Sequence, residues 1–221
     1  MATASATKTE VGPGELRFVV NGVDWEGYEA LLKILPRVRM TYDRGSVEFM
    51  SPLFVHEHYS TLLRKLVEFL AEELDIDYLP AGSTTFRKKG MERGLEPDEC
   101  FYFASARRIR SIKDFDSEID PPPDLAIEVD ITSSSLDRMG IYAALGVPEV
   151  WRFDGETLSV SLLQEGRVYA ESARSAAFPD VPIGDVPTLL LDPDGNSMRR
   201  WTGKVRVWIR DEVVPRAGGA R

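Results

Sequence analysis

The chain has 221 residues, of which 43% are hydrophobic and 29% are charged, a balance typical of a globular protein. Its net charge of −9 and pI of about 4.9 argue against a surface covered with basic patches for nucleic acid. They do not exclude a nuclease, because metal-binding carboxylates add negative charge. No apolar run could span a membrane and no signal-peptide core follows Met1, so we expect a cytoplasmic protein. The single cysteine, Cys100, fits a reducing cytosol and a place in the core.

The length suits one domain. Residues 1–14 are small and polar and include Gly and Pro, so they predict a disordered tail. We assign the domain to residues 15–212 and expect a flexible tail over residues 213–221.

The first elements alternate between helix and strand. A helix capped by Asp24 is predicted to run to Leu35, and residues 38–50 predict a β-hairpin around a Gly-containing turn. Further strands are expected at 78–79, 83–88 and 96–103.

The strongest helix is predicted over residues 56–74. His56 and His58 flank Glu57 at its start; residues two apart do not face together on a helix, which favours solvent-facing or capping histidines over metal ligands. The prediction of the helix itself rests on an apolar stripe at helical spacing, made of Leu62, Leu63, Leu66, Val67, Leu70 and Leu74.

The strand predicted over residues 124–131 has two unlike faces. One is aliphatic, and we expect it to be buried under the helix at 56–74; the other carries three carboxylates and no cation. Such a face favours a divalent metal, and a solvated face of an edge strand is the alternative that the pattern leaves open. The two faces consist of Leu125, Ile127, Val129 and Ile131, and of Asp124, Ala126, Glu128 and Asp130.

A helix is predicted next, over residues 135–145. The run 132–135 consists of capping residues, and Gly146 and Pro148 form a stop signal. Arg138 falls in the first turn, from which a cation could reach the carboxylate face.

The last part of the chain predicts a β-meander over 149–153, 157–163 and 167–171, followed by a helix. The apolar stripe of this helix is interpreted as core or dimer interface rather than as a platform for stacking bases, and we expect a homodimer. The stripe consists of Met198, Trp201, Val205, Trp208 and Ile209.

Five segments together form a specific pattern. They are Gly-Ser-Thr-Thr-Phe-Arg at 82–87, Gly-Leu-Glu-Pro-Asp-Glu-Cys-Phe-Tyr at 94–102, Pro-Asp-Leu-Ala-Ile-Glu-Val-Asp at 123–130, Ser-Leu-Asp-Arg at 135–138 and Ile-Tyr-Ala-Ala-Leu-Gly-Val-Pro-Glu-Val-Trp-Arg-Phe-Asp at 141–154. From about Val38 to Arg210 the chain resembles the Uma-two family, a branch of the PD-(D/E)XK phosphodiesterase superfamily.

The resemblance implies an α+β fold (α/β/α-like) with a restriction endonuclease-like core, a mixed β-sheet flanked by helices, and the order of predicted elements agrees. It also implies an endonuclease that depends on Mg2+ or Mn2+ and hydrolyses nucleic acid, for which we expect DNA.

The resemblance further implies roles for individual residues. Asp98 and Glu128 would converge on the metal, with the carbonyl of Val129 as a third ligand. Asp130 occupies the place of the usual Lys of the superfamily motif. In the Uma-two pattern that Lys moves to the following helix, where this chain has Arg138.

Other roles stay open. Asp124 and Asp130 could form a second layer of acids around the metal. Glu57 matches a superfamily Glu near the metal, but it could instead complement the positive end of its helix. Arg138 could be catalytic or could only neutralise its acidic neighbours. The rival to an enzyme is a regulatory or assembly module that kept the fold and lost the chemistry; the acidic pI and Arg138 favour it, whereas the complete carboxylate set favours the enzyme.

Overall fold

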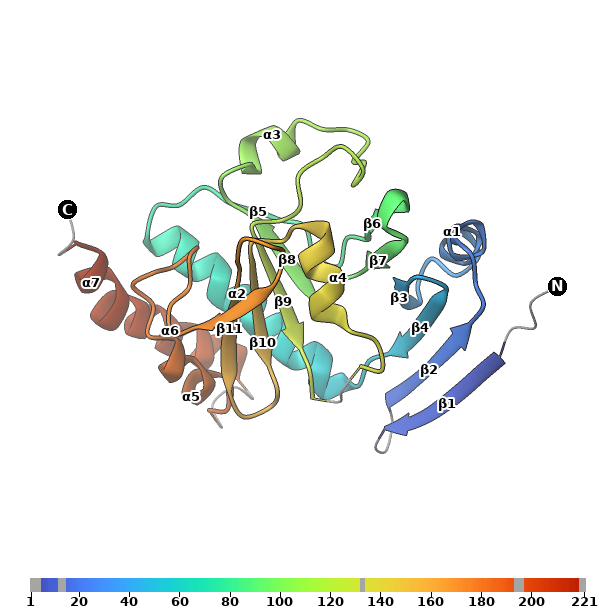
Figure 1. Ribbon diagram of the computed structural model, residues 1–221. Coiled ribbons are helices and arrows are strands. Elements are labelled where there is room, and N and C mark those ends of the chain that lie inside the picture. The colour runs from blue at the N-terminus through green and yellow to red at the C-terminus, as the bar shows by residue number, and fades with distance from the viewer. Residues whose placement is uncertain (1–4, 12–14, 132–133, 193–196, 219–221) are drawn as a thin grey trace.

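The computed structural model describes residues 5–11, 15–131, 134–192 and 197–218, which form two six-stranded β-sheets and several helices (Figure 1). The first sheet has the strand order β1-β2-β4-β3-β7-β6, and its pairings are antiparallel. Its strands are β1 (Ser5–Val11), β2 (Glu15–Asn21), β3 (Arg39–Asp43), β4 (Ser46–Ser51), β6 (Phe86–Lys88) and β7 (Arg93–Leu95).

The second sheet has the order β12-β11-β10-β9-β8-β5. It is mixed, because β9 and β10 run parallel while the other pairs are antiparallel, and this confirms the predicted mixed sheet. Its strands are β5 (Leu79–Pro80), β8 (Glu99–Tyr102), β9 (Leu125–Val129), β10 (Glu149–Phe153), β11 (Leu158–Leu163) and β12 (Tyr169–Ser172).

Helices cover both faces of the second sheet, with α2 (Phe54–Glu73) on one side and α4 (Arg138–Leu145) on the other (Figure 1). The predicted α+β class is therefore confirmed. No helix within the described ranges combines the length and the apolar character that crossing a membrane requires. The remaining helical elements are α1 (Trp25–Ile34), α3 (Ala106–Arg110), α5 (Val186–Leu190), α6 (Met198–Trp208), the π-helix η4 (Ile209–Val213), α7 (Val214–Gly218) and two 3₁₀ turns, η1 (Lys89–Met91) and η2 (Ile183–Asp185).

Several local predictions are confirmed. The Asp24 carboxylate caps α1 by accepting the main-chain N–H of Gly27 at 2.8 Å, and β3 and β4 form the predicted hairpin. β10, β11 and β12 form the predicted antiparallel meander.

Both ends of the chain differ from the predicted tails. Within residues 1–14, residues 5–11 form strand β1, which pairs with β2. Hydrogen bonds between the two main chains hold this strand, and composition alone does not predict such bonds. At the other end, η4 and α7 extend the final helix to Gly218, through most of the tail predicted over 213–221. The other residues of the two predicted tails (1–4, 12–14 and 219–221) lie outside the described residues.

The helix predicted over 135–145 starts later, at Arg138. Its cap is Asp137, whose carboxylate accepts the main-chain N–H of Gly140 at 2.9 Å. The run 132–135 is therefore not the cap, and residues 132–133 lie outside the described part of the chain. Arg138 is the first helical residue, so the expectation that it lies in the first turn is confirmed.

Strand β9 lies in the middle of its sheet, between β8 and β10. Leu125, Ile127 and Val129 are buried in one cluster with the apolar stripe of α2, as predicted, and Ile131 is half-buried against it. On the opposite face, Ala126 packs in a second cluster with residues of α4. The carboxylate face is thus covered by a helix and is not the solvated face of an edge strand.

Replacing Ile127 with alanine should lower the free energy of unfolding by about 2–5 kcal/mol, because it opens a cavity in a fully buried strand. Urea denaturation of the two proteins measures the difference. A loss near zero would mean that the side chain of Ile127 does not pack against α2.

Candidate active site

Asp98 lies in the connection from β7 to β8, one residue before β8 begins, and its side chain is only 3% exposed. Its Oδ2 accepts the main-chain N–H of Val129 at 2.7 Å and lies 3.1 Å from Nε2 of His56, near the start of α2. Its Oδ1 accepts a hydrogen bond from Nη1 of Arg39 on β3. Asp98 therefore joins the ends of four elements: β3, α2, β8 and β9.

The surroundings of Asp98 favour its ionised form. Burial by itself raises the pKa of the carboxyl group, but the contact with His56 and the charges of Arg39 and Arg138 outweigh it, so the pKa is lowered. Asp98 is therefore an anion at neutral pH, the state that a metal ligand requires.

Glu128 lies on β9 and faces α4. Its Oε1 accepts hydrogen bonds from Nη2 of Arg138 at 2.5 Å and from the hydroxyl of Tyr142. Burial raises its pKa; Arg138 opposes that rise, and the negative charge of Asp98 adds to it. Asp98 binds the main-chain N–H of Val129, the residue after Glu128, so the two carboxylates lie near each other.

The guanidinium group of Arg138 is fixed by two strands, β3 and β9, and by the connection between β7 and β8. It donates to Oε1 of Glu128, to Oγ1 of Thr41 at 2.6 Å and to the main-chain oxygen of Glu96 at 2.8 Å. Burial lowers the pKa of Arg138, but Glu128 more than compensates, so the pKa is raised. Arg138 is a permanent cation beside Glu128.

The segment that precedes Arg138 is held by the first sheet. Glu48 on β4 is 1% exposed and accepts the hydroxyl of Ser134 and the main-chain N–H of Ser135, each at 2.7 Å. Arg17 on β2 balances its charge with an ion pair of 3.1 Å. Glu48 thereby ties the chain before α4 to β4.

The side chains joined by these contacts form one cluster, which consists of Arg39, Thr41, His56, Asp98, Glu128, Arg138 and Tyr142. Glu57 and Asp130 lie at its margins, each paired with an arginine. Oε1 of Glu57 lies 3.1 Å from Nη2 of Arg39, the arginine that also binds Asp98. Oδ2 of Asp130 accepts from Nη2 of Arg152 at 2.5 Å. Glu57 is therefore linked to Asp98 through Arg39, while Asp130 lies on the side of Glu128.

A pocket of about 220 Å³ opens beside Glu128. It brings three carboxylates and two guanidinium groups to one opening, a combination suited to a metal and a phosphate group. Its walls are formed by Glu128, Asp130, Ser134, Leu136, Asp137, Arg138, Met139 and Arg152.

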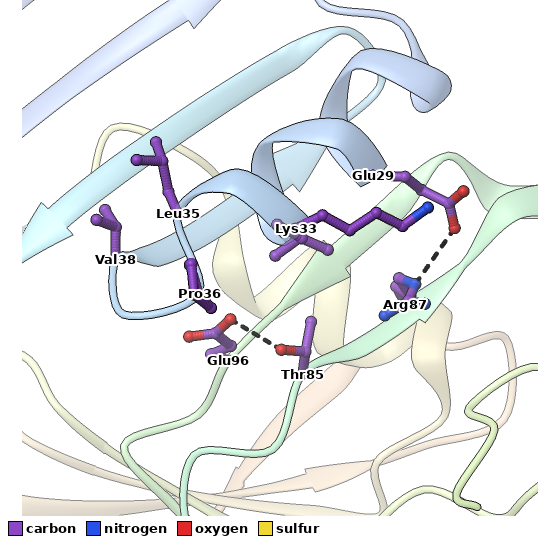
Figure 2. Close-up of a pocket in the computed structure, with 9 residues that line it drawn as sticks. Glu29, Lys33, Leu35, Pro36, Val38, Thr85, Arg87 and Glu96 are labelled. Atoms are coloured by element: carbon purple, nitrogen blue, oxygen red, sulfur yellow. Dashed lines mark hydrogen bonds and ion pairs between the residues drawn. The ribbon is translucent and has the colours of Figure 1, made fainter.

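A second recess, of about 290 Å³, adjoins the cluster on the side of the first sheet and is shown in Figure 2. Leu35, Pro36 and Val38 form an apolar wall. The hydroxyl of Thr85 donates to Oε1 of Glu96 at 2.8 Å at its base. The main-chain oxygen of Glu96 binds Arg138, so this residue links the recess to the candidate site.

Asp124 is separated from the cluster by its hydrogen bonds. Its Oδ2 accepts the main-chain N–H groups of Phe103 at 2.6 Å and Ala104 at 3.1 Å, past the end of β8. Asp98 and Asp124 each follow a proline, but only Asp98 lies with Glu128. The expectation that Asp124 is one of the acids around a metal has no support in these contacts.

The sequence alone did not reveal three members of the cluster: Arg39, His56 and Tyr142. His56 is 1% exposed and lies beside Asp98, so the expected solvent-facing or capping position is wrong. Arg39 and Thr41 alternate along β3 and both face the cluster, which was the available signal for Arg39. Tyr142 lies four residues after Arg138, one helical turn away, and both reach Glu128.

The donor atoms fit a hard cation such as Mg2+. Two carboxylates are available, and the carbonyl of Val129 points to the same side of β9 as its N–H, which binds Asp98. Both carboxylates are balanced by arginines, Arg39 and Arg138. Among the described residues, no group of three or more His, Cys, Asp or Glu side chains is arranged to hold a metal by itself.

Glu99, the residue after Asp98, makes the stability of the folded protein depend on pH. Burial raises its pKa to about 7, although Arg64, 3.6 Å away, opposes the rise. The folded protein therefore binds a proton that the unfolded chain releases near pH 4.5, and this group's contribution to stability should fall as the pH rises from 4.5 to about 7.

The variant Glu99→Gln should remove this dependence and be more stable than the wild type above pH 7, by about 1–3 kcal/mol. Urea denaturation of both proteins between pH 4.5 and 8 measures it. A stability difference that stays constant across this range would contradict the raised pKa.

The family model described as "Uma2: Putative restriction endonuclease" matches residues 25–188, which include the whole cluster. No curated protein matches the sequence significantly. Among solved structures, the fold is similar to that of "a putative nuclease belonging to DUF820 from Anabaena variabilis", with 14% sequence identity and a TM-score of 0.47 over 74% of this chain and 90% of that chain.

Proposed function

The chain belongs to the Uma2 family of restriction endonuclease-like proteins, and from this premise we propose that it is a metal-dependent endonuclease that hydrolyses phosphodiester bonds in DNA. The observation that carries the proposal is the meeting of Asp98, Glu128 and Arg138 where β8 and β9 adjoin the start of α4. Asp98, which is held as an anion, and Glu128 offer two carboxylates of the kind that a catalytic Mg2+ binds.

Asp98, Glu128 and the main-chain carbonyl of Val129 would hold Mg2+ or Mn2+. When bound, such an ion polarises the phosphate and lowers the pKa of a coordinated water. Arg39 and Arg138 balance the two carboxylates in the structure, so binding of the ion has to compete with these ion pairs.

Arg138 is proposed to stabilise negative charge on the phosphate. It cannot accept a proton at any ordinary pH, because the pKa of a guanidinium group exceeds about 12. Its three hydrogen bonds hold the positive charge in place at the pocket, and Arg152, which also lines the pocket, can donate to a phosphate oxygen.

The proton of the attacking water needs a carboxylate. Asp130 is proposed for this role, because it lines the same pocket as Glu128 and Arg138. Glu57 is 49% exposed and paired with Arg39, so we assign it to positioning Arg39 against Asp98.

A second candidate function is a nuclease-fold module without catalytic activity. The observation in its favour is that Arg39 and Arg138 already neutralise the two carboxylates without a metal. In that case the cluster would only join the two sheets and α4, and the protein would act by assembly or regulation.

A cleavage assay separates the two functions. The wild type is incubated with single- and double-stranded DNA and RNA in Mn2+, Mg2+ or EDTA, alongside Glu128→Gln. The nuclease predicts DNA cleavage that requires the metal and is lost in Glu128→Gln. If the wild type and Glu128→Gln form equally little cleaved product, even with protein in excess of substrate, the result would contradict the proposed nuclease activity and favour the inactive module.

A further inference from the structure

The outer face of the C-terminal helix carries an unusual distribution of charge. α6 and η4 form one continuous helix at the edge of the molecule (Figure 1). One side is buried in the core cluster with α2, through Trp201, Val205, Ile209 and Val213. Trp201, Val205 and Ile209 belong to the apolar stripe for which the sequence left core and dimer interface as alternatives. These three residues lie in the core.

The opposite side forms a shallow groove to which only this helix contributes. Its residues recur at a spacing of four, in two parallel rows, which is the pattern that forms ridges in the commonest mode of helix packing. η4 is a turn with i→i+5 hydrogen bonds, so a spacing of four stays nearer one line there than in an α-helix. The groove is lined by Arg199, Arg200, Gly203, Lys204, Val207, Trp208, Asp211 and Glu212.

These eight residues form four pairs when the helix is reversed, and three of the four pairs are complementary in charge or size. The two members of each pair lie at the same distance on either side of the midpoint between Val205 and Arg206. Basic residues at one end meet acidic residues at the other, and a glycine meets the largest side chain. The four pairs are Arg199 with Glu212, Arg200 with Asp211, Gly203 with Trp208 and Lys204 with Val207.

This pattern suits a two-fold axis, because in an isologous interface every contact between residue i of one subunit and residue j of the other is repeated between residue j and residue i. We therefore propose that this face binds a second copy of the chain, with the two helices antiparallel and their midpoints in contact. A Cβ atom added at Gly203 would have nothing within 4 Å, so the space above this residue is open to Trp208 of the partner subunit.

The surface suits a second copy better than nucleic acid. Val207 is 56% exposed and Trp208 is half-buried, so apolar area lies at the centre of the groove. The basic end alone would attract phosphate, but Asp211 and Glu212 at the other end would repel it. Glu212 also lies 3.1 Å from Arg216 of its own helix, and such exposed pairs are weak enough to exchange partners.

The test uses two charge-reversal variants and sedimentation velocity over a range of protein concentrations. One variant is Arg199→Glu/Arg200→Glu, and the other is Asp211→Lys/Glu212→Lys. The wild type should dimerise, and each variant alone should dimerise at least about tenfold more weakly, because like charges then face each other. A mixture of the two variants should form heterodimers, since every facing pair is again of opposite sign.

Circular dichroism of each variant confirms that it is folded. Val207→Arg, which places a charge at the apolar centre, is a second variant that should weaken the dimer without reversing the ends. A wild type that stays monomeric at all concentrations would overturn the proposal and leave the face to another partner. A dimer that both reversals and Val207→Arg leave unchanged would overturn it too, because the interface would then lie elsewhere. Neither outcome depends on whether the protein cleaves DNA.

Discussion

Replacing Arg138 with alanine is expected to lower the free energy of unfolding by about 3–5 kcal/mol, because Glu128 then stays buried without its cation. The variant also loses hydrogen bonds to Thr41 and to the main chain at Glu96, which join β3 and the β7–β8 connection to α4. Chemical denaturation measures the loss of stability. At a temperature where the variant is folded, metal-dependent cleavage should fall by about 100-fold or more, because charge on the phosphate is no longer stabilised.

Arg138→Lys is the matched variant. Lysine keeps the positive charge but has a single ammonium nitrogen. The guanidinium group of Arg138 has several nitrogens and donates to Thr41, Glu96 and Glu128 at the same time. We expect a smaller loss of stability and partial retention of cleavage. If alanine leaves cleavage intact and lowers only stability, Arg138 is a structural counter-ion. If lysine raises cleavage well above that of the wild type, the natural arginine marks a weakened enzyme.

Asp98→Asn should reduce cleavage by at least about 100-fold, because a neutral amide is a poor ligand for a hard cation. The side chain keeps its shape and one oxygen that can accept the main-chain N–H of Val129. Loss of the charge leaves Arg39 and His56 without their anion, so stability should also fall, by about 1–3 kcal/mol.

Asp124→Asn is the control, since both aspartates follow a proline and precede a strand of the same sheet. Asp124 accepts hydrogen bonds from the main-chain N–H groups of Phe103 and Ala104, which lie outside the cluster. Its replacement should cost about 1 kcal/mol of stability and leave cleavage unchanged. If the two variants lose cleavage equally, Asp98 has no special role in the reaction.

The parts of the fold that were predictable are those fixed by local pattern. Alternation along β9 identified which side chains pack under α2, and the cap at Asp24 identified the start of α1. Hydrogen bonds between distant segments were not predictable in this way. β1 is ordered through its pairing with β2, and Ser134 and Ser135 bond Glu48 on a different sheet instead of capping α4.

In the candidate site, too, residues that belong to a local pattern were predictable, whereas contacts between distant segments were not. The carboxylate pattern and the family resemblance pointed to Asp98, Glu128 and Arg138, and the structure places Asp98 against the main chain beside Glu128 and Arg138 against the carboxylate of Glu128. His56 was misjudged, because its burial depends on how the start of α2 meets β8 and β9, and helical spacing contains no such information. Arg39 was missed because the hairpin that carries it belongs to the other sheet.

Calorimetric titration with Mn2+ tests most directly whether Asp98 and Glu128 hold one divalent ion together. The wild type should bind one ion per chain, Asp98→Asn and Glu128→Gln should each weaken binding by at least about tenfold, and Asp124→Asn should bind like the wild type. A folded wild type that binds no Mn2+, or binding that persists unchanged in Asp98→Asn and Glu128→Gln, would contradict the metal centre proposed here.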